Sequence, residues 1–435
     1  MRFNNPILHL YIILFIFLFI TTNFHWGKDN WKGVLESDAK GYYAYLPALF
    51  IYQDLNFKFI DRIEQSEFTS PHLRYEFRVT SHGQSLNKYF VGTSICQLPF
   101  FGIAHGLAIL SEYPANGYSV WYMRMVTIAA LFYCGLGLYF FILLARRFQM
   151  SSTVLSLMLY AIAFGTHLFV YTLVEPGMSH VYSFGLISMF VYLLHEYLIR
   201  KKPSKMIYAL AALLSIIVLI RPTNILVLLL VPFLAGSISR IIEFFKQQFK
   251  RILPLVISVI IFGLGLGIQA LWYKFATGYW WIYSYGSEGF DFYNPHFIDI
   301  LFSYKKGLFL YTPMLLLGFL STFFLWQKKE RFRFFCWISF FTVITYILSS
   351  WHSWYYGGSF SSRVYVEYIP LFMLPLGLYL SSLNLSYKRT LSSILVVLLI
   401  AMCQIQSYQY RYYDIHYSEM DKERYWQVFL MRNKY

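Results

Sequence analysis

The sequence predicts an all-α fold, a polytopic bundle of about eleven transmembrane helices. Three observations support this prediction. Hydrophobic residues make up 58% of the 435 residues, whereas charged residues make up only 13%. A soluble domain of this length cannot bury so much apolar surface. Long apolar runs recur along the whole chain, with enough residues for roughly a dozen crossings at ~20 residues each. Basic clusters occupy every second connection between these runs.

The composition excludes several classes of protein. It does not suit a soluble enzyme, a disordered chain, a collagen-like chain or a coiled coil, and a transmembrane β-barrel lacks long apolar runs. The net charge of +15 is explained by basic residues that flank membrane spans, so we expect no nucleic-acid partner. The four cysteines form no CxxC pair and are expected to be buried apolar residues. They are Cys96, Cys134, Cys336 and Cys403.

The first apolar run, residues 7–24, is expected to be an uncleaved signal anchor. Arg2 precedes it and no small-residue cleavage site follows it. The other expected spans are 119–144, 152–172, 178–198, 206–220, 223–239, 252–276, 308–326, 333–350, 364–382 and 390–409.

The basic clusters predict the orientation, because lysine and arginine favour the cytoplasmic side of a membrane. The clusters are Arg146-Arg147; Arg200, Lys201, Lys202 and Lys205; Arg240, Lys246, Lys250 and Arg251; Lys328, Lys329, Arg331 and Arg333; and Lys388-Arg389. Residues 1–435 then form a single transmembrane domain with a cytoplasmic N-terminus. The principal outer regions are the long first loop 25–118, the loops 277–307 and 351–363, and the tail 410–435.

The apolar segment 89–110 conflicts with this alternation if it crosses the membrane. A crossing there would place Arg146-Arg147 outside. We therefore expect residues 89–110 to form an interfacial or re-entrant helix on the outer side. The first outer loop is then about 90 residues long, and long connections in compact folds are usually functional.

The first candidate site is the segment from Glu36 to Pro47, soon after the first span. Asp38 can act there as a general base or substrate anchor. Glu36, Tyr42 and Tyr43 are candidate substrate-binding residues, since aromatic rings pack on sugars or lipid headgroups. An alternative interpretation is an acidic cap on a short interfacial helix, with tyrosines at the membrane surface.

The second candidate site is the aromatic loop from Trp351 to Arg363. The planar guanidinium of Arg363 suits a phosphate, and His352, Trp354 and Tyr355 are candidate substrate-binding residues. The alternative is an interfacial aromatic belt in which Arg363 pairs with Glu367 one helical turn later.

Further candidate ligands lie on the outer side. Lys305 and Lys306 go against the positive-inside tendency, so they indicate either a phosphate ligand or anionic lipid headgroups. Arg221 adds a cation at a helix corner. His180 follows the tight turn Glu175-Pro176-Gly177 and can be either a substrate ligand or a hydrogen-bonded residue at a helix end.

Together these segments resemble the GT-C superfamily of polytopic membrane glycosyltransferases. The resemblance rests on the order and sidedness of several short segments. They are the signal anchor, Ser37-Asp38-Ala39-Lys40-Gly41-Tyr42 in the first loop, Asn87-Lys88-Tyr89 to Pro99-Phe100, Ala145-Arg146-Arg147-Phe148, Arg221-Pro222, Asn294-Pro295-His296 to Lys306-Gly307-Leu308-Phe309, and Trp354-Tyr355-Tyr356-Gly357-Gly358-Ser359-Phe360 before Arg363. The last two resemble segments of bacterial membrane proteins assigned to this superfamily.

The resemblance implies a glycosyltransferase that uses a polyprenyl-phosphate-linked sugar at the extracytoplasmic face of a membrane, expected to be a bacterial inner membrane. Asp38 would take the proton of a glycan, lipid or protein acceptor, which attacks the anomeric carbon with inversion. Arg363, Lys305, Lys306, Lys88 and Arg221 would bind the donor phosphate. Many members of the superfamily have two adjacent acids in the first loop. Here Glu36 lies two residues before Asp38, so we expect no metal and no other cofactor. A transporter or flippase of a lipid-linked glycan is the alternative, and an acyltransferase that uses His180 or His352 is a third.

Overall fold

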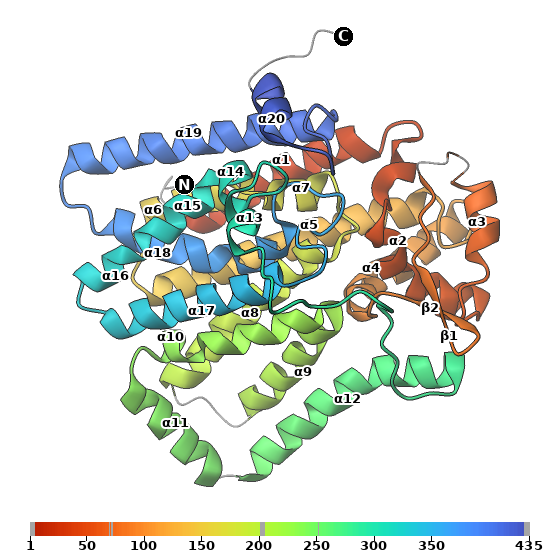
Figure 1. The fold of residues 1–435 in the computed structure, drawn as a ribbon, viewed down its shortest axis with the longest axis horizontal. Helices are drawn as coiled ribbons and strands as arrows, with labels where there is room; N and C mark the ends of the chain where they lie inside the picture. Colours follow the sequence, from red (N-terminus) through yellow and green to blue (C-terminus); the bar gives the residue numbers. More distant parts are fainter. Residues whose placement is uncertain (1–4, 69, 71–72, 201–204, 251, 430–435) are drawn as a thin grey trace.

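The computed structural model describes residues 5–68, 70, 73–200, 205–250 and 252–429. Within these ranges the chain is an all-α bundle with one two-stranded sheet (Figure 1). The expected basic residues Lys201, Lys202 and Arg251, and residues 430–435 of the expected outer tail, lie outside the described part of the chain.

Eight helices of the described chain are long and apolar enough to cross a membrane, or nine if one sharply bent pair is a single span. They are α1 (Pro6–His25), α4 (Gly92–Leu110), α5 (Val120–Arg147), α8 (Ser179–Arg200), α12 (Ile252–Thr277), α17 (Arg331–Ser349), η5 with α18 (Arg363–Tyr368 and Ile369–Ser381) and α19 (Ser386–Arg411). The all-α prediction is confirmed. The count of long helices is lower than the expected eleven spans because the remaining expected spans are short or interrupted.

Some of the short helices in these remaining spans begin at a proline. Pro222, Pro232 and Pro313 each lie in the first turn of a new helix, since a proline has no N–H to continue the preceding one. The short or broken segments are α6 (Ser152–Gly165) with α7 (Leu168–Leu173); α9 (Lys205–Ile220); η4 (Pro222–Leu230) with α10 (Val231–Ala235); and α14 (Leu308–Tyr311) with α15 (Pro313–Ser321) and α16 (Phe323–Gln327).

The helices α5 and α8 pack along each other at the centre of the bundle. A Cβ added to Gly185 of α8 would lie 2.6 Å from the backbone oxygen of Tyr133 on α5. The missing side chain therefore lets the two backbones approach, as small residues do between helices in membranes. At the edge of the bundle, α12 pairs with α9 but exposes a row of apolar side chains. They are Ile252, Leu253, Val256, Val259, Ile260, Leu264, Ile268, Leu271 and Phe275.

The expected basic connection after residue 239 is itself largely helical. Helix α11 (Ile238–Lys250) turns away from the preceding pair η4–α10 by 117°. Its apolar residues Ile238, Ile242, Phe245 and Phe249 share one face at spacings of three and four, and all are exposed. Such an amphipathic helix suits a membrane surface.

The segment expected to be an interfacial or re-entrant helix is helical. Its residues Gly92–Leu110 form one continuous helix of 19 residues, even though Pro99 lies inside it. By length and composition α4 is also a candidate span, and a continuous helix of this kind fits the interfacial helix that the alternation of basic clusters favours.

The chain between α1 and α4 forms a lobe at one end of the bundle (Figure 1). Its elements are η1 (Asn30–Val34), α2 (Asp38–Pro47), η2 (Ala48–Tyr52), α3 (Ile60–Ser66), β1 (Arg78–Ser81) and β2 (Gln84–Asn87). The strands pair antiparallel, with Ser81 opposite Gln84. His82 and Gly83 form the two-residue turn, and both have positive φ angles, as a tight hairpin that matches strand twist requires. This hairpin was not foreseen in the sequence.

The connections between α16 and α17 and between α18 and α19 lie at the end of the bundle opposite to the lobe (Figure 1). Two short helices complete the fold, α13 (Phe297–Phe302) and α20 (Lys422–Val428). The four cysteines all lie in the described chain and are free thiols; Cys96, Cys134 and Cys403 are buried as expected, whereas Cys336 is half-buried.

Candidate active site

A buried ion pair joins the start of α2 to the start of η5. Arg363 Nη2 lies 2.7 Å from Asp38 Oδ2, and only 7% and 8% of the two residues is exposed. The pair connects the two segments that the sequence marked as candidate sites. An unpaired charge at this depth would be costly, so the contact fixes the position of α2 relative to η5.

Two tyrosines hold the other oxygen of the Asp38 carboxylate. Tyr89 donates to Oδ1 at 2.7 Å and Tyr75 at 3.0 Å, and the two hydroxyl oxygens lie 2.7 Å apart. Burial alone would raise the pKa of Asp38. The charge of Arg363 and the hydrogen bonds from Tyr89, Arg363 and Tyr75 outweigh burial, so the pKa lies below its ordinary value. Asp38 is therefore an ionised carboxylate whose two oxygens are both oriented.

The β-hairpin places Tyr89 beside Asp38. Asn87, at the end of β2, donates to the carbonyl of Gly41 at 2.7 Å and accepts the backbone N–H of Tyr89 at 3.0 Å. A Cβ on Gly41 would lie 2.4 Å from the Tyr89 ring. Because Gly41 follows Asp38 on the same helix, its missing side chain lets Tyr89 reach the carboxylate.

The backbone is strained beside both members of the ion pair. Ser37, directly before Asp38, has φ +52°, and Ser361, two residues before Arg363, has φ +57°. Non-glycine residues adopt such angles at a cost, and they do so most often where function requires a particular geometry.

A second cluster of charges lies within the bundle, around Glu367. The carboxylate oxygen Oε1 of Glu367 lies 3.1 Å from His180 Nδ1 and 3.6 Å from Arg221 Nη1. Glu367 and His180 are fully buried. Arg221 also faces the Tyr356 ring, with 5.9 Å between the guanidinium carbon and the ring centroid. Glu367 thus holds His180 and Arg221, while Arg363 pairs with Asp38 instead of with Glu367.

A third group links the turn before α8 to the C-terminal segment. The hydroxyl of Tyr410 donates to Glu175 Oε1 at 2.5 Å. Lys306 is 2% exposed and donates to the carbonyls of Ser359 and Tyr417. Burial raises the pKa of Glu175 to about 7 and lowers the pKa of Lys306 to about 7. The positive charge of Arg363 lowers the pKa of both groups, so it opposes burial at Glu175 and adds to it at Lys306.

Several buried polar atoms of these three groups have no hydrogen-bond partner within the described chain. They are Glu175 Oε2, Ser179 Oγ, His180 Nε2, Arg221 Nη1, Ser362 Oγ, Arg363 Nε and Glu367 Oε2. Buried polar groups in proteins are nearly always paired. These atoms belong to the charged groups described above or to residues next to them in the chain, which makes this region a candidate for binding a polar molecule.

Five of the thirteen predicted site residues belong to these three groups, namely Asp38, Arg363, Arg221, His180 and Lys306. Tyr42 joins them, since its ring packs on Tyr89 with centroids 4.7 Å apart. Lys88 lies next to Tyr89 in the chain and pairs with Glu288, and its ammonium faces the rings of Tyr89 and Tyr285.

Other predicted residues have different surroundings. Tyr43 is buried in an aromatic cluster and donates to the Gly117 carbonyl at 2.5 Å, so it has a packing role in this structure. Glu36 and His352 are exposed. Lys305 Nζ lies 3.6 Å from the centroid of the Tyr355 ring.

Trp354 belongs with the loop 277–307 in this structure. Its ring stacks on His296, with centroids 5.4 Å apart. This contact joins two predicted outer loops. It does not connect Trp354 to the Asp38–Arg363 ion pair.

The sequence did not predict that five further residues belong to these three groups. They are Tyr75, Tyr89, Glu175, Glu367 and Tyr410. Glu175 and Glu367 carried a usable signal, because a carboxylate beside an apolar span is expensive and usually functional. Nothing in the sequence distinguishes Tyr75, Tyr89 and Tyr410 from the other tyrosines, because 39 tyrosines occur along the chain. Only the fold shows which three lie at the site.

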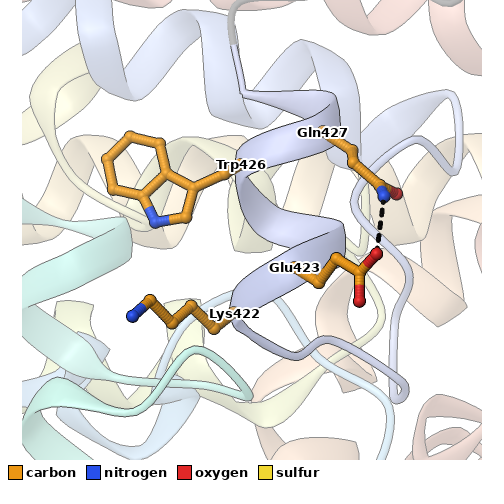
Figure 2. Close-up of a pocket in the computed structure, with 4 residues that line it drawn as sticks. All are labelled: Lys422, Glu423, Trp426 and Gln427. Atoms are coloured by element: carbon orange, nitrogen blue, oxygen red, sulfur yellow. Dashed lines mark hydrogen bonds between the residues drawn. The ribbon is translucent and has the colours of Figure 1, made fainter.

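The described part of the chain brings together no three His, Cys, Asp or Glu residues in a way that could hold a metal ion. The structure also has hollows around α20, one of about 570 Å³, lined by Lys422, Glu423, Trp426 and Gln427. In Figure 2, Lys422 and Trp426 lie on one side of the helix and Glu423 and Gln427, which share a 3.2 Å hydrogen bond, on the other. This hollow lies on the surface of one short helix and includes no residue of the Asp38 region.

No protein-family model, no curated protein and no solved structure matches the chain.

Proposed function

We propose that the protein is an integral membrane glycosyltransferase of the GT-C type. It transfers a sugar from a polyprenyl-phosphate-linked donor to a glycan, lipid or protein acceptor at the extracytoplasmic face, with inversion at the anomeric carbon. The observation that carries the proposal is the buried Asp38–Arg363 pair within a region that also holds Arg221 and Lys306. A carboxylate beside several cations suits a reaction that removes a proton and releases a phosphate.

The distribution of charge supports an extracytoplasmic site. Connections that carry basic clusters, such as those before α17 and α19, lie at the end of the bundle opposite to the lobe (Figure 1). The positive-inside tendency assigns that end to the cytoplasm, and therefore assigns the lobe and Asp38 to the other side. A lipid-linked donor fits this side, because nucleotide sugars are supplied in the cytoplasm. A bacterial inner membrane is the membrane that we propose.

Asp38 is the proposed general base. Its depressed pKa keeps it ionised, and Tyr89 and Tyr75 fix its orientation. Arg363 is the proposed principal ligand of the donor phosphate, because its planar guanidinium can bind two phosphate oxygens. Arg221 and Lys306 supply further positive charge to the departing polyprenyl phosphate. Lys88 and Lys305 are more distant candidates for the same role.

Mass spectrometry of envelope glycans and lipids tests this proposal. Cells that lack the protein should lose one glycoconjugate, which the wild-type chain restores and Asp38→Asn does not. Asp61→Asn is a matched control, because Asp61 pairs with Arg78 at 2.7 Å in the same loop but is largely exposed. Full restoration by Asp38→Asn would contradict the role of Asp38. Movement of labelled lipid-linked glycan across liposomes, without a new glycosidic bond, would instead indicate a flippase.

A further inference from the structure

The guanidinium of Arg363 uses few of its donors in this structure. One N–H bond is directed at Asp38, from Nη2 to Oδ2. The nearest partner of Nη1 is the Met178 sulfur at 3.9 Å, and Nε is buried without a partner. A guanidinium has five N–H donors, so Arg363 retains the capacity to bind an anion in addition to, or in place of, Asp38.

The two oxygens of Asp38 are held in different ways. Oδ1 accepts the hydroxyls of Tyr89 and Tyr75, both within the lobe. Within the described chain, Oδ2 accepts a hydrogen bond from Arg363 alone. If Arg363 moved, Oδ1 would remain anchored and Oδ2 would become the free acceptor that a general base requires.

We propose that the donor phosphate and the Asp38 carboxylate are alternative partners of Arg363, so that donor binding releases Oδ2 to act as the base. This inference rests on the proposed glycosyltransferase function. It adds an order of events, in which the donor binds first and the acceptor is activated second. Without a donor, Asp38 remains masked by Arg363, which protects the site from unproductive proton transfer.

The chemical step then balances. The acceptor hydroxyl gives its proton to Asp38 Oδ2 while its oxygen forms a bond to the anomeric carbon. The bond between that carbon and the phosphate oxygen breaks, and its electron pair leaves on the polyprenyl phosphate, which Arg363 holds. After the products leave, Asp38 gives its proton to water and Arg363 returns to Oδ2.

Competition for Arg363 makes a counterintuitive prediction for binding. Removal of the Asp38 charge should abolish catalysis but improve phosphate binding, because Arg363 is no longer shared. Polyprenyl phosphate without a sugar is the probe, and its dissociation constant is measured with protein reconstituted in nanodiscs. We expect Asp38→Asn to bind about tenfold more tightly than wild type, which corresponds to one charge-assisted hydrogen bond. Asp61→Asn should bind as wild type does, and Arg363→Gln should bind more weakly than either.

The outcomes of this experiment distinguish failure of the competition from failure of the proposed function. Equal or weaker binding by Asp38→Asn, with normal binding by the wild type, overturns the competition and leaves the proposed function in place. A wild-type protein that does not bind polyprenyl phosphate overturns both.

A second measurement needs no variant at Asp38. Carbodiimides modify protonated and accessible carboxyl groups, so polyprenyl phosphate should increase the rate at which Asp38 of the wild type is labelled. A rate that stays constant or falls would also overturn the competition.

Discussion

Arg363 Nη2 lies 2.7 Å from Asp38 Oδ2, although 325 positions separate the two residues in the sequence. The contact joins the lobe that follows the first helix to the segment that opens η5. It is buried, it is flanked by strained backbone at Ser37 and Ser361, and within the described chain Arg363 Nε and the neighbouring Ser362 Oγ are buried without a hydrogen-bond partner. These features distinguish it from the exposed ion pairs of the same chain.

Loss of Arg363 should destabilise the protein more than loss of an exposed partner. Arg363→Met leaves the Asp38 carboxylate buried without its cation, which costs on the order of 3 kcal/mol in comparable pairs. Lys32→Met is the control, since Lys32 and Asp29 form a surface pair 3.4 Å apart of a kind that contributes about 0–1 kcal/mol. The free energy of unfolding in mixed micelles is measured for both variants. An equal loss in the two would contradict the assignment of Asp38 and Arg363 as a buried, interdependent pair.

Tyr89→Phe should slow transfer without unfolding the protein. It removes the 2.7 Å hydrogen bond to Asp38 Oδ1, so the carboxylate loses part of its orientation and its pKa rises. We expect kcat to fall about tenfold and the acid limb of the pH–rate profile to move to higher pH. Tyr52→Phe is a matched control, because Tyr52 donates to the Asn116 carbonyl at 2.9 Å. An unchanged acid limb in Tyr89→Phe would contradict the assignment.

Gly41→Ala tests how Tyr89 is positioned. The new Cβ would lie 2.4 Å from the ring, so Tyr89 must move away from Asp38. We expect a loss of transfer at least as large as that of Tyr89→Phe, together with a lower melting temperature. Gly102→Ala in α4 meets no atom within 4 Å and should be tolerated, since alanine favours a helix by about 1 kcal/mol. Wild-type activity in Gly41→Ala would show that Tyr89 is dispensable.

Glu175 should make stability depend on pH in a defined window. Its pKa rises from 4.5 to about 7 in the folded chain. Between these values the unfolded chain loses the proton that the folded chain keeps, so the free energy of unfolding falls as pH rises from 4.5 to 7. The contribution is on the order of 3 kcal/mol.

Glu175→Gln should remove that slope. Melting curves of the two proteins across this range measure the difference, and parallel pH profiles would contradict the burial of an ionisable Glu175.

The helical architecture could be predicted from the sequence because long apolar runs identify helices directly. Their interruptions were harder to predict. Proline at 222, 232 and 313 begins new short helices, and hydropathy alone does not distinguish these from continuous spans. The hairpin at His82-Gly83 was missed because its strands have only four residues each and no apolar alternation.

The site was predicted in part for a physical reason. Charges beside apolar spans are few, so Asp38, Arg363, Arg221, His180 and Lys306 stood out, and the structure brings them together. Their pairing could not be predicted, because residues one helical turn apart, such as Arg363 and Glu367, are natural partners in sequence. The bend of the chain at Ser361 and the approach of α2 direct Arg363 to Asp38 instead.

We propose that Asp38 catalyses sugar transfer from a lipid phosphate. The most direct measurement uses purified protein in liposomes with a radiolabelled polyprenyl-phosphate sugar and the acceptor identified by mass spectrometry. We predict that the wild type and Asp61→Asn form the glycosidic bond, whereas Asp38→Asn binds the donor and forms no product. Product formation by Asp38→Asn at the wild-type rate would contradict the account.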